Sequence, residues 1–384
     1  MNQLTETVKA LYVMGDTRLF ANRVGLVGGV RYERSEGEGR GFLQTPTDVF
    51  QRNPNGSFVL VNGARVRKPE AGAAGSLAEA KLIYHRNGAS AHGMRDGYFP
   101  SLHASWSIAE NFAFKAAFAS TQARPDFSTS LLPSTTVSPS NITDPALGSL
   151  GTVTIRNPLL KPWTADNYDG RLEYYLKNGY VAVGYYRKFI QDFVVSRAEL
   201  LESPEEAAAV GLEPEYVGWT ASTSFNSGKA IVSGWEFEVR HSLDPILPRW
   251  ARGFSLRGSL NLSDADGQRG GWGQMSRQKA SAMLNYQNAK LRLGLGWNFE
   301  GRIDGALVTL DGEPGQSYIE ERHLFDATAE YRLTRRVSLF ASGTNLFNAG
   351  RNTARESAHL PHWARLQQAS AFGANYTLGA KASF

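Results

Sequence analysis

The sequence predicts an all-β protein, an antiparallel up-and-down β-barrel of the transmembrane kind. Apolar side chains recur at every second position in segment after segment, which is the period of a strand with one apolar and one polar face. The connections between these segments alternate between a few turn-forming residues and long stretches rich in Gly, Pro, Ser and Asn. Short periplasmic turns on one rim and long extracellular loops on the other are typical of a membrane barrel.

About thirteen strands are expected along the chain. The alternation is clearest near residue 260, where Leu256, Leu260 and Leu262 alternate with Arg257 and Asn261. The chain is also rich in aromatic residues, which favour strands and interfacial girdles. The strands are predicted at 6–19, 23–34, 96–107, 112–122, 165–176, 180–190, 217–242, 254–263, 275–287, 290–301, 319–332, 336–346 and 373–384.

The two kinds of connection fall between these strands in turn. The short turns are expected at 21–23, 109–111, 177–179, 287–289 and 334–336. The long loops are expected at about 36–95, 123–164, 191–216, 302–318 and 348–372. Within the longest loop, the stretch 69–87 has Ala, Glu and Leu at helical spacing and predicts a short helix.

The last strand ends the chain on alternating apolar residues. Tyr376, Leu378 and Phe384 share one face, and an outer-membrane barrel closes with a strand of this kind. These three residues are therefore the predicted signal for outer-membrane insertion.

Composition excludes several other classes. With no cysteine there is no disulfide framework or thiolate site. The net charge of +5 is spread along the chain, whereas nucleic-acid binding needs a basic stripe. No run of about 18 apolar residues predicts a transmembrane helix, and Met1 to Glu6 show no signal peptide.

Two sets of residues are candidates for function. Charged residues on the polar face of the strands are expected to line the lumen, where they either pair with one another, with water and with a plug, or form a direct path for substrate; they are Lys115, Arg171, Glu173, Glu236, Glu238, Arg240, Arg257, Lys279, Arg292, Asp326, Glu330 and Arg332. Aromatic residues in or beside the loops are expected to stack against a sugar or an aromatic chelate, or else to form an interfacial girdle or pack within the loops; they are Trp163, Tyr216, Trp219, Trp272 and Trp363.

No enzyme, metal or cofactor is predicted. His359 and His362 have a spacing that two ligands of one ion can use, and Asp264 and Asp266 resemble the start of a calcium loop, but further ligands do not follow. No G-x-S-x-G motif and no Ser/His/Asp arrangement occur. Polar loop residues are the simpler interpretation.

Several segments resemble, in order, the C-terminal part of the barrel of TonB-dependent outer-membrane receptors, in particular those of Xanthomonas and Caulobacter type. The segment 157–175 is similar to the family's N-P-x-L-K-P-E…N-Y…E-Y pattern, although Trp163 stands where Glu is usual. The other matching segments are Gly28-Gly29-Val30-Arg31-Tyr32-Glu33, Asp96-Gly97-Tyr98-Phe99-Pro100-Ser101-Leu102, Ala123-Arg124-Pro125-Asp126-Phe127, Asn345-Leu346-Phe347-Asn348 and the terminal Tyr376 to Phe384.

This resemblance implies that residues 1–384 are part of a barrel of about 22 strands. The signal peptide, TonB box and plug domain of such receptors have no counterpart here, and the odd strand number predicts that strands are missing at the front.

It also implies an outer-membrane location and energy-coupled uptake of an iron chelate, cobalamin or an oligosaccharide. The implied partners are outer-membrane lipid, the TonB complex acting through the missing plug, and the barrel-assembly machinery, which reads the C-terminal strand. A passive porin-like channel and a soluble all-β binding protein are the alternatives.

Overall fold

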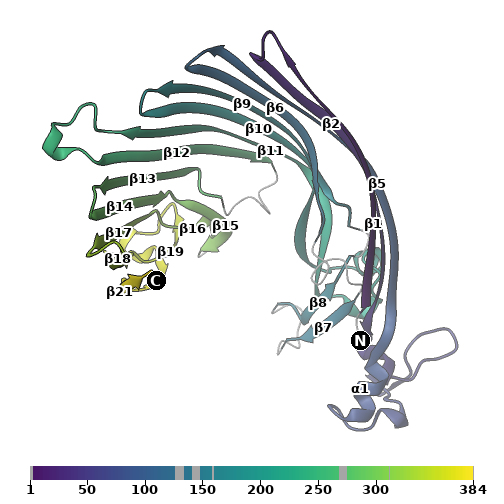
Figure 1. Cartoon of the computed structure of the whole chain (residues 1–384). Coiled ribbons are helices and arrows are strands. Elements are labelled where there is room, and N and C mark those ends of the chain that lie inside the picture. Colours follow the sequence, from purple (N-terminus) through teal and green to yellow (C-terminus); the bar gives the residue numbers. More distant parts are fainter. Residues whose placement is uncertain are drawn as a thin grey trace.

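The molecule is an arch made of one large sheet, whose strands follow each other in chain order (Figure 1). The computed structural model describes residues 3–125, 134–140, 148–157, 160–267, 275–310 and 312–383. Its long antiparallel strands are β1 (Gln3–Leu19), β2 (Val24–Gln44), β5 (Tyr84–Ala109), β6 (Phe112–Ala123), β9 (Trp163–Leu176), β10 (Gly179–Leu200), β11 (Thr220–Ser242), β12 (Phe254–Gly267), β13 (Gln278–Gln287), β14 (Leu291–Glu300), β17 (Arg322–Arg332), β18 (Val337–Thr344) and β21 (Asn375–Ala382).

The predicted all-β meander is confirmed, and each predicted strand has its counterpart. The ends differ most at the rim of the long loops, where β2 continues to Gln44, β5 begins at Tyr84 and β10 continues to Leu200. In the extension of β2, one face carries Glu36 and Glu38 and the other carries Gly37 and Gly39, so the apolar side chains that mark a strand in the sequence are missing. Backbone pairing between β2 and β5 nevertheless continues through this extension.

The predicted helix over 69–87 is wrong in extent. The structure has a 3-10 helix η2 (Pro69–Ala71) and a short α1 (Leu77–Ile83), whose N-cap Ser76 accepts a hydrogen bond from the backbone N–H of Glu79. Gly72 and Gly75 adopt positive φ angles and separate the two helices. From Tyr84 onward the chain pairs with β2, so residues 84–87 are strand.

Several short strands lie inside segments predicted as loops. They are β3 (Leu60–Val61), β4 (Ala64–Arg65), β7 (Thr135–Pro139), β8 (Gly151–Ile155), β15 (Ile303–Leu310), β16 (Glu313–Ile319), β19 (Thr353–Ser357) and β20 (Leu366–Gln368). Some pair locally, as β3 does with β4 and β15 with β16, while others pair with distant segments, as β16 does with β19 and β8 with β11. Strands β15, β16, β19 and β20 form a separate sheet that joins two long connections, while β7 pairs with β2 and β8 with β11.

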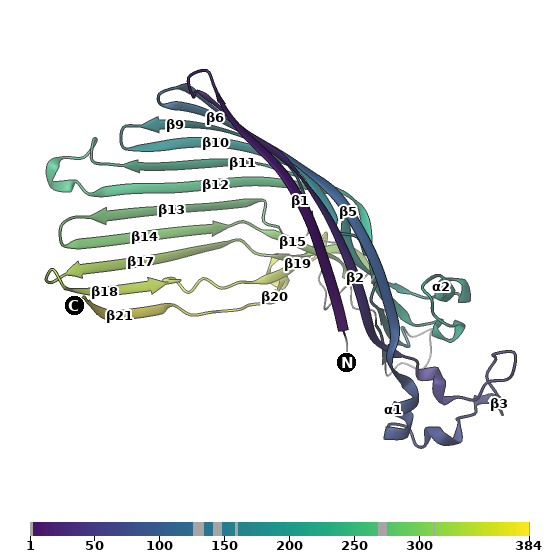
Figure 2. The same ribbon diagram turned by 45° about the vertical axis from the view of Figure 1, so that its right-hand side comes forward.

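The connections are sorted by length, as predicted. The long ones, with α1, α2 (Pro204–Ala209) and η5 (Pro214–Tyr216), lie at one end of the strands, and the short ones lie at the other (Figures 1 and 2). We call these ends the long-loop rim and the short-turn rim. The exception on the short-turn rim is the connection 243–253 between β11 and β12, which contains η6 (Arg249–Ala251). No described helix has the length and apolarity needed to span a membrane.

The arch does not close in the described chain. Among the described strands, β1 is hydrogen-bonded to β2 alone and β21 to β18 alone, so both outer edges carry unpaired backbone groups. An unpaired edge has no partner in lipid and is a template for pairing with other chains. The chain expressed alone is therefore expected not to form a stable monomeric barrel in detergent. On a semi-native gel, a compact monomer band that shifts on boiling would contradict this prediction.

Candidate functional site

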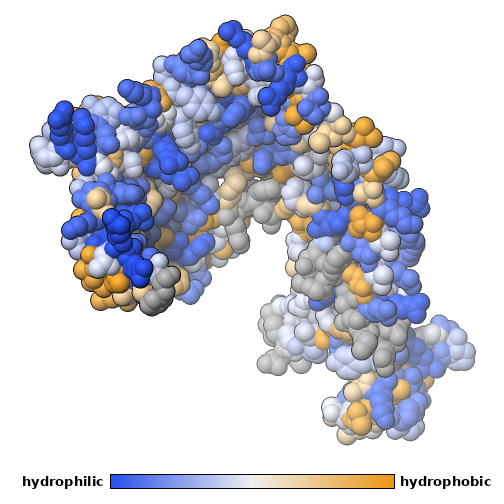
Figure 3. Space-filling model, in the orientation of Figure 1, coloured by the Kyte–Doolittle hydropathy of each residue, from blue (hydrophilic) through white to orange (hydrophobic). Residues whose placement is uncertain are grey.

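A polar row crosses the sheet on one face. The cross-strand register sets Lys115 opposite Arg171, and Lys279 opposite Glu300. In full the row runs through Lys115, Arg171, Gly184, Glu236, Asn261, Lys279, Glu300 and Arg322. Figure 3 shows hydrophilic residues over the visible inner side of the arch. Such a surface suits contact with water or with another polar part of a protein.

Glu173 is the centre of this face. It is 6% exposed, and its carboxylate accepts hydrogen bonds from Lys115 Nζ at 2.8 Å, Arg171 Nε at 2.8 Å and the Tyr175 hydroxyl at 2.5 Å. The Arg171 guanidinium also donates to Glu238 at 2.8 Å. These contacts hold four neighbouring side chains of alternating charge in one place, so this part of the face is rigid and electrically balanced.

The other predicted charged residues lie on the same face but make fewer contacts. Glu236 accepts from Asn261 at 3.2 Å, and Lys279 lies 3.4 Å from Glu300. Asp326 accepts from the backbone N–H of Asn345. The register sets Arg292 opposite Glu330, which also pairs with Lys381 at 3.4 Å, Arg240 opposite Arg257, and Arg332 opposite Ser338.

Four side chains on this face were not among the residues predicted from sequence. Glu300 and Arg322 lie 3.8 Å apart and extend the row to β17. Tyr175 and Tyr180 donate their hydroxyl protons to Glu173 and Glu238. The same two-residue alternation that marks Arg292 and Asp326 also marks Glu300 and Arg322, so the signal was present in the sequence.

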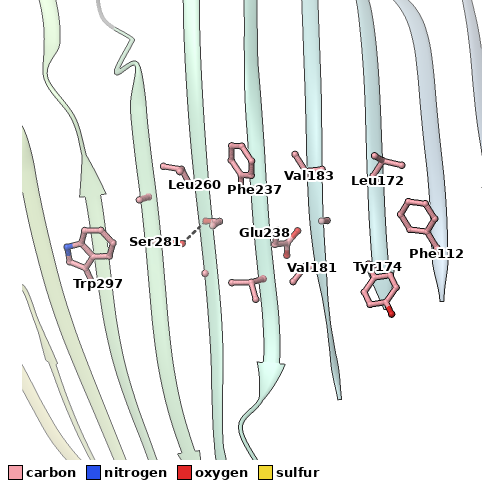
Figure 4. A pocket seen from close by; sticks show the side chains of 15 residues that line it. Phe112, Leu172, Tyr174, Val181, Val183, Phe237, Glu238, Leu260, Ser281 and Trp297 are labelled. Carbon is pink, nitrogen blue, oxygen red and sulfur yellow. Dashed lines mark hydrogen bonds between the residues drawn. The ribbon is translucent and has the colours of Figure 1, made fainter. Parts of the chain in front are cut away.

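The opposite face is apolar and uncovered. Figure 4 shows Leu172, Val183, Phe237 and Leu260 side by side on successive strands. Phe237 is 41% exposed and Leu293 is 42% exposed, and neither Leu260 nor Phe325 is buried. A soluble two-layer protein would bury this face under a second sheet or helices. An apolar face this wide and open needs an apolar surrounding.

The loop aromatics are spread over several environments. Tyr216 is 6% exposed and packs edge-to-face on Trp219 at 5.5 Å, in a cluster with Val137, Val153, Leu201, Ala207 and Ala221. Trp163 is half-buried against Phe193. Trp363 is 84% exposed, and Trp272 lies outside the described residues. Tyr216 and Trp219 therefore pack within the loop core, while Trp363 is exposed.

At the C-terminal strand, Tyr376 and Leu378 are exposed on the outer edge strand β21. Phe384 lies outside the described residues.

Two long connections are joined by a carboxylate pair. Arg52 donates to Glu213 at 2.6 Å and lies 3.7 Å from Glu215, and Thr47 also donates to Glu213. Burial, followed by the neighbouring Glu213 carboxylate, raises the pKa of Glu215 to about 7, and one oxygen of Glu215 has no hydrogen-bond partner. The pKa of Glu213 is lowered, because its hydrogen bonds, including that from Arg52, outweigh its burial.

These shifts predict a contact that weakens as the pH rises. While the two connections are in contact, Glu215 keeps its proton up to about pH 7, whereas a free carboxyl loses it near pH 4.5. The contact between the connections is therefore weakened progressively as the pH rises from 4.5 to 7. Below pH 4.5, protonation of Glu213 weakens the same contact. Hydrogen exchange of residues 45–71, corrected for intrinsic rates, is expected to be about tenfold faster at pH 8 than at pH 5. Glu215→Gln should remove this dependence, and an unchanged dependence in that variant would disprove the assignment.

The small sheet β15-β16-β19-β20 holds a second group of charged side chains at the long-loop rim. Arg302 donates to Glu356 at 2.5 Å and to Asp304 at 2.9 Å, and its guanidinium lies 3.8 Å from the ring centroid of Tyr318. His359 contacts Glu313 at 2.6 Å. The described residues contain no cluster of His, Asp and Glu that could hold a metal ion.

Solved structures share this architecture. The FrpB iron transporter of Neisseria meningitidis matches with a TM-score of 0.59 and 14% identity, over 99% of this chain and 46% of its own. The ferric enterobactin receptor PfeA of Pseudomonas aeruginosa, in complex with enterobactin, matches with 0.57 and 17%, over 100% and 55%. The copper transporter OprC matches with 0.55 and 16%, over 99% and 49%. The chain thus spans about half the length of these proteins.

No curated protein sequence matches the chain. The model of the family described as "TonB dependent receptor-like, beta-barrel" matches residues 1–346. With nine-tenths of the sequence covered and the barrel-type sheet in place, the chain belongs to the TonB-dependent receptors, as part of their β-barrel domain.

Proposed function

We propose that this chain forms wall and external loops of an outer-membrane receptor that takes up a scarce nutrient by energy-coupled transport. The observation that carries the proposal is the pair of faces: an uncovered apolar face that fits lipid, and behind it a charged face that fits a watery interior. In hydrocarbon only a paired, closed sheet satisfies its backbone, so the remaining strands would come from a longer chain, as the length of the solved structures supports.

In this proposal the long-loop rim is extracellular and carries the ligand contacts. Loops held on a rigid scaffold are the usual place for recognition, and the exposed Trp363 is the described candidate for stacking on a ligand. An iron chelate is the first class to test, because solved relatives are named as iron and ferric enterobactin receptors; cobalamin and oligosaccharides are the other candidates. The charged inner face would hold the plug on which TonB acts, and β21 would be read by the assembly machinery.

The lack of cysteine allows a direct test of location and sidedness. Single cysteines replace Asn62, at the tip of the β3–β4 hairpin, and Asn288, in the β13–β14 turn. In intact cells a membrane-impermeant maleimide is expected to label Asn62→Cys and to label Asn288→Cys only after the outer membrane is permeabilised. Labelling of both in intact cells, or recovery of the chain in the soluble fraction, would refute the proposal.

Energy-coupled transport is distinguished from passive flow by whether uptake depends on the proton gradient. In cells that carry the complete receptor containing this chain, uptake of the ferric chelate is expected to stop when an uncoupler collapses the proton gradient, whereas uptake through a passive channel would continue.

A further inference from the structure

The short-turn rim holds a positive charge that its own structure does not neutralise. Its turns span residues 20–23, 110–111, 177–178, 243–253, 288–290 and 333–336. Their basic side chains are Arg23, Lys177, Arg249, Arg252, Lys290, Arg335 and Arg336, and their acidic ones are Glu110 and Asp244. Seven positive and two negative charges leave a net of +5. That equals the net charge of the entire chain, so the rest of the molecule is balanced.

One turn on this rim also exposes apolar surface. In the connection 243–253, Trp250 is 86% exposed and Ile246 is 75% exposed. Arg249 and Arg252 flank the tryptophan within or just after η6. Hydrogen bonds hold the turn in shape. The Asp244 carboxylate accepts from the backbone N–H of Gly253 at 2.7 Å, and the backbone N–H of Leu247 donates to the carbonyl of Leu243. A hydrogen-bonded turn thus exposes an indole that has an arginine on either side of it in the sequence.

The strands below this turn add two more arginines. Arg240 and Arg257 are directly opposite each other in the β11–β12 register, where like charges repel. Within the described residues, no carboxylate lies within 4.0 Å of the side chains of these two arginines, and the same holds for Arg249 and Arg252. Arg171, by contrast, pairs with both Glu173 and Glu238. Glu238, two residues before Arg240 in β11, accepts hydrogen bonds from Arg171 and Tyr180 instead.

We propose that the β11–β12 turn binds anionic phospholipid headgroups in the leaflet beside the short-turn rim. Guanidinium groups bind phosphate with paired hydrogen bonds, and tryptophan favours the boundary between headgroups and acyl chains. Trp250 and Ile246 enter that boundary, while Arg249 and Arg252 hold the phosphates; Arg240 and Arg257 lie on the polar face of the sheet and contribute only to the positive potential of this end of the strands. This inference rests on the proposed function, because it needs the sheet to cross a bilayer.

Brominated lipids test the inference on the longer receptor that contains this chain, because the chain alone leaves two sheet edges unpaired. Tryptophan fluorescence is measured in vesicles that carry bromine on the acyl chains of either phosphatidylglycerol or phosphatidylcholine. The contribution of Trp250 to the fluorescence is obtained by subtracting the fluorescence of the Trp250→Phe variant from that of the native protein. We expect this contribution to be quenched more strongly by brominated phosphatidylglycerol. Arg249→Gln and Arg252→Gln should each lower the apparent preference for the anionic lipid about fivefold, and high salt should act in the same direction.

The outcomes separate this inference from the proposed function. Trp235 and Trp297 lie on the apolar face, and their quenching reports contact of the sheet with lipid. If they are quenched while Trp250 shows no preference for the anionic lipid, the sheet is in the bilayer and the headgroup site is refuted. If none is quenched, both proposals fail. Lys290→Gln, on another turn of the same rim, is the matched control and should leave the response of Trp250 unchanged.

Discussion

Leu260→Arg is expected to make membrane insertion less favourable by about 2–4 kcal/mol, which is the cost of an arginine on the lipid face near the midplane. Leu260 lies in the middle of β12 and on the apolar face, between Phe237 and Ala280 in the register. Flotation of the chain with vesicles in a density gradient measures the effect as a fall of about 30-fold to 1000-fold in the insertion equilibrium.

The neighbouring position provides the control. Asn261→Arg places the same side chain on the polar face of the same strand, next to Glu236, and should leave flotation nearly unchanged. Leu293→Arg should cost less than Leu260→Arg, because Leu293 is close to the β13–β14 turn and the penalty decreases toward the interface. Equal losses for Leu260→Arg and Asn261→Arg would show that the two faces do not differ in their surroundings.

Glu173→Gln is expected to destabilise the sheet by about 3 kcal/mol, because it leaves Lys115 and Arg171 beside a buried neutral group. The carboxylate is 6% exposed, so water cannot replace it. The free energy of unfolding is measured by urea titration in detergent, followed by circular dichroism at matched protein concentration.

Glu236→Gln is the matched control for this second prediction. Glu236 lies on the same face, is exposed, and has one hydrogen bond, from Asn261. Its loss should change the free energy of unfolding by less than about 1 kcal/mol. A similar loss in both variants would mean that burial around Glu173 does not set its contribution.

The fold was predictable from sequence because each strand carries its own signal. A two-residue period with one apolar side marks β12 and β14 without any knowledge of their neighbours, and the lengths of the connections then give the meander. The extensions of β2 and β5 escaped prediction because neither stretch has a regular apolar face; glycine and alanine alternate there with charged and polar residues. The sheet β15-β16-β19-β20 escaped because its central pairing joins Gly315 to Ser357, far apart in sequence.

The candidate site was predictable to a smaller degree. Alternation places Arg171, Glu173 and Glu238 on one face, but it does not show that their three side chains touch. That contact depends on the relative register of β9, β10 and β11, which the turn at 177–178 and the connection 201–219 set. The pair of Glu213 and Glu215 with Arg52 brings together two loops more than a hundred residues apart and has no local signature.

The bridges made by β7 and β8 determine an order of assembly. Pairing of Leu43 with Thr135, and of Thr152 with Thr220, completes a circuit through β2, β7, β8, β11, β10, β9, β6 and β5 at the long-loop rim. Hairpins such as β9–β10 close short segments of chain and are expected to form early. These two bridges join segments far apart in sequence, so their loop-closure entropy is larger and they are expected to form later. We therefore expect the long-loop rim to be completed last, after the meander has formed.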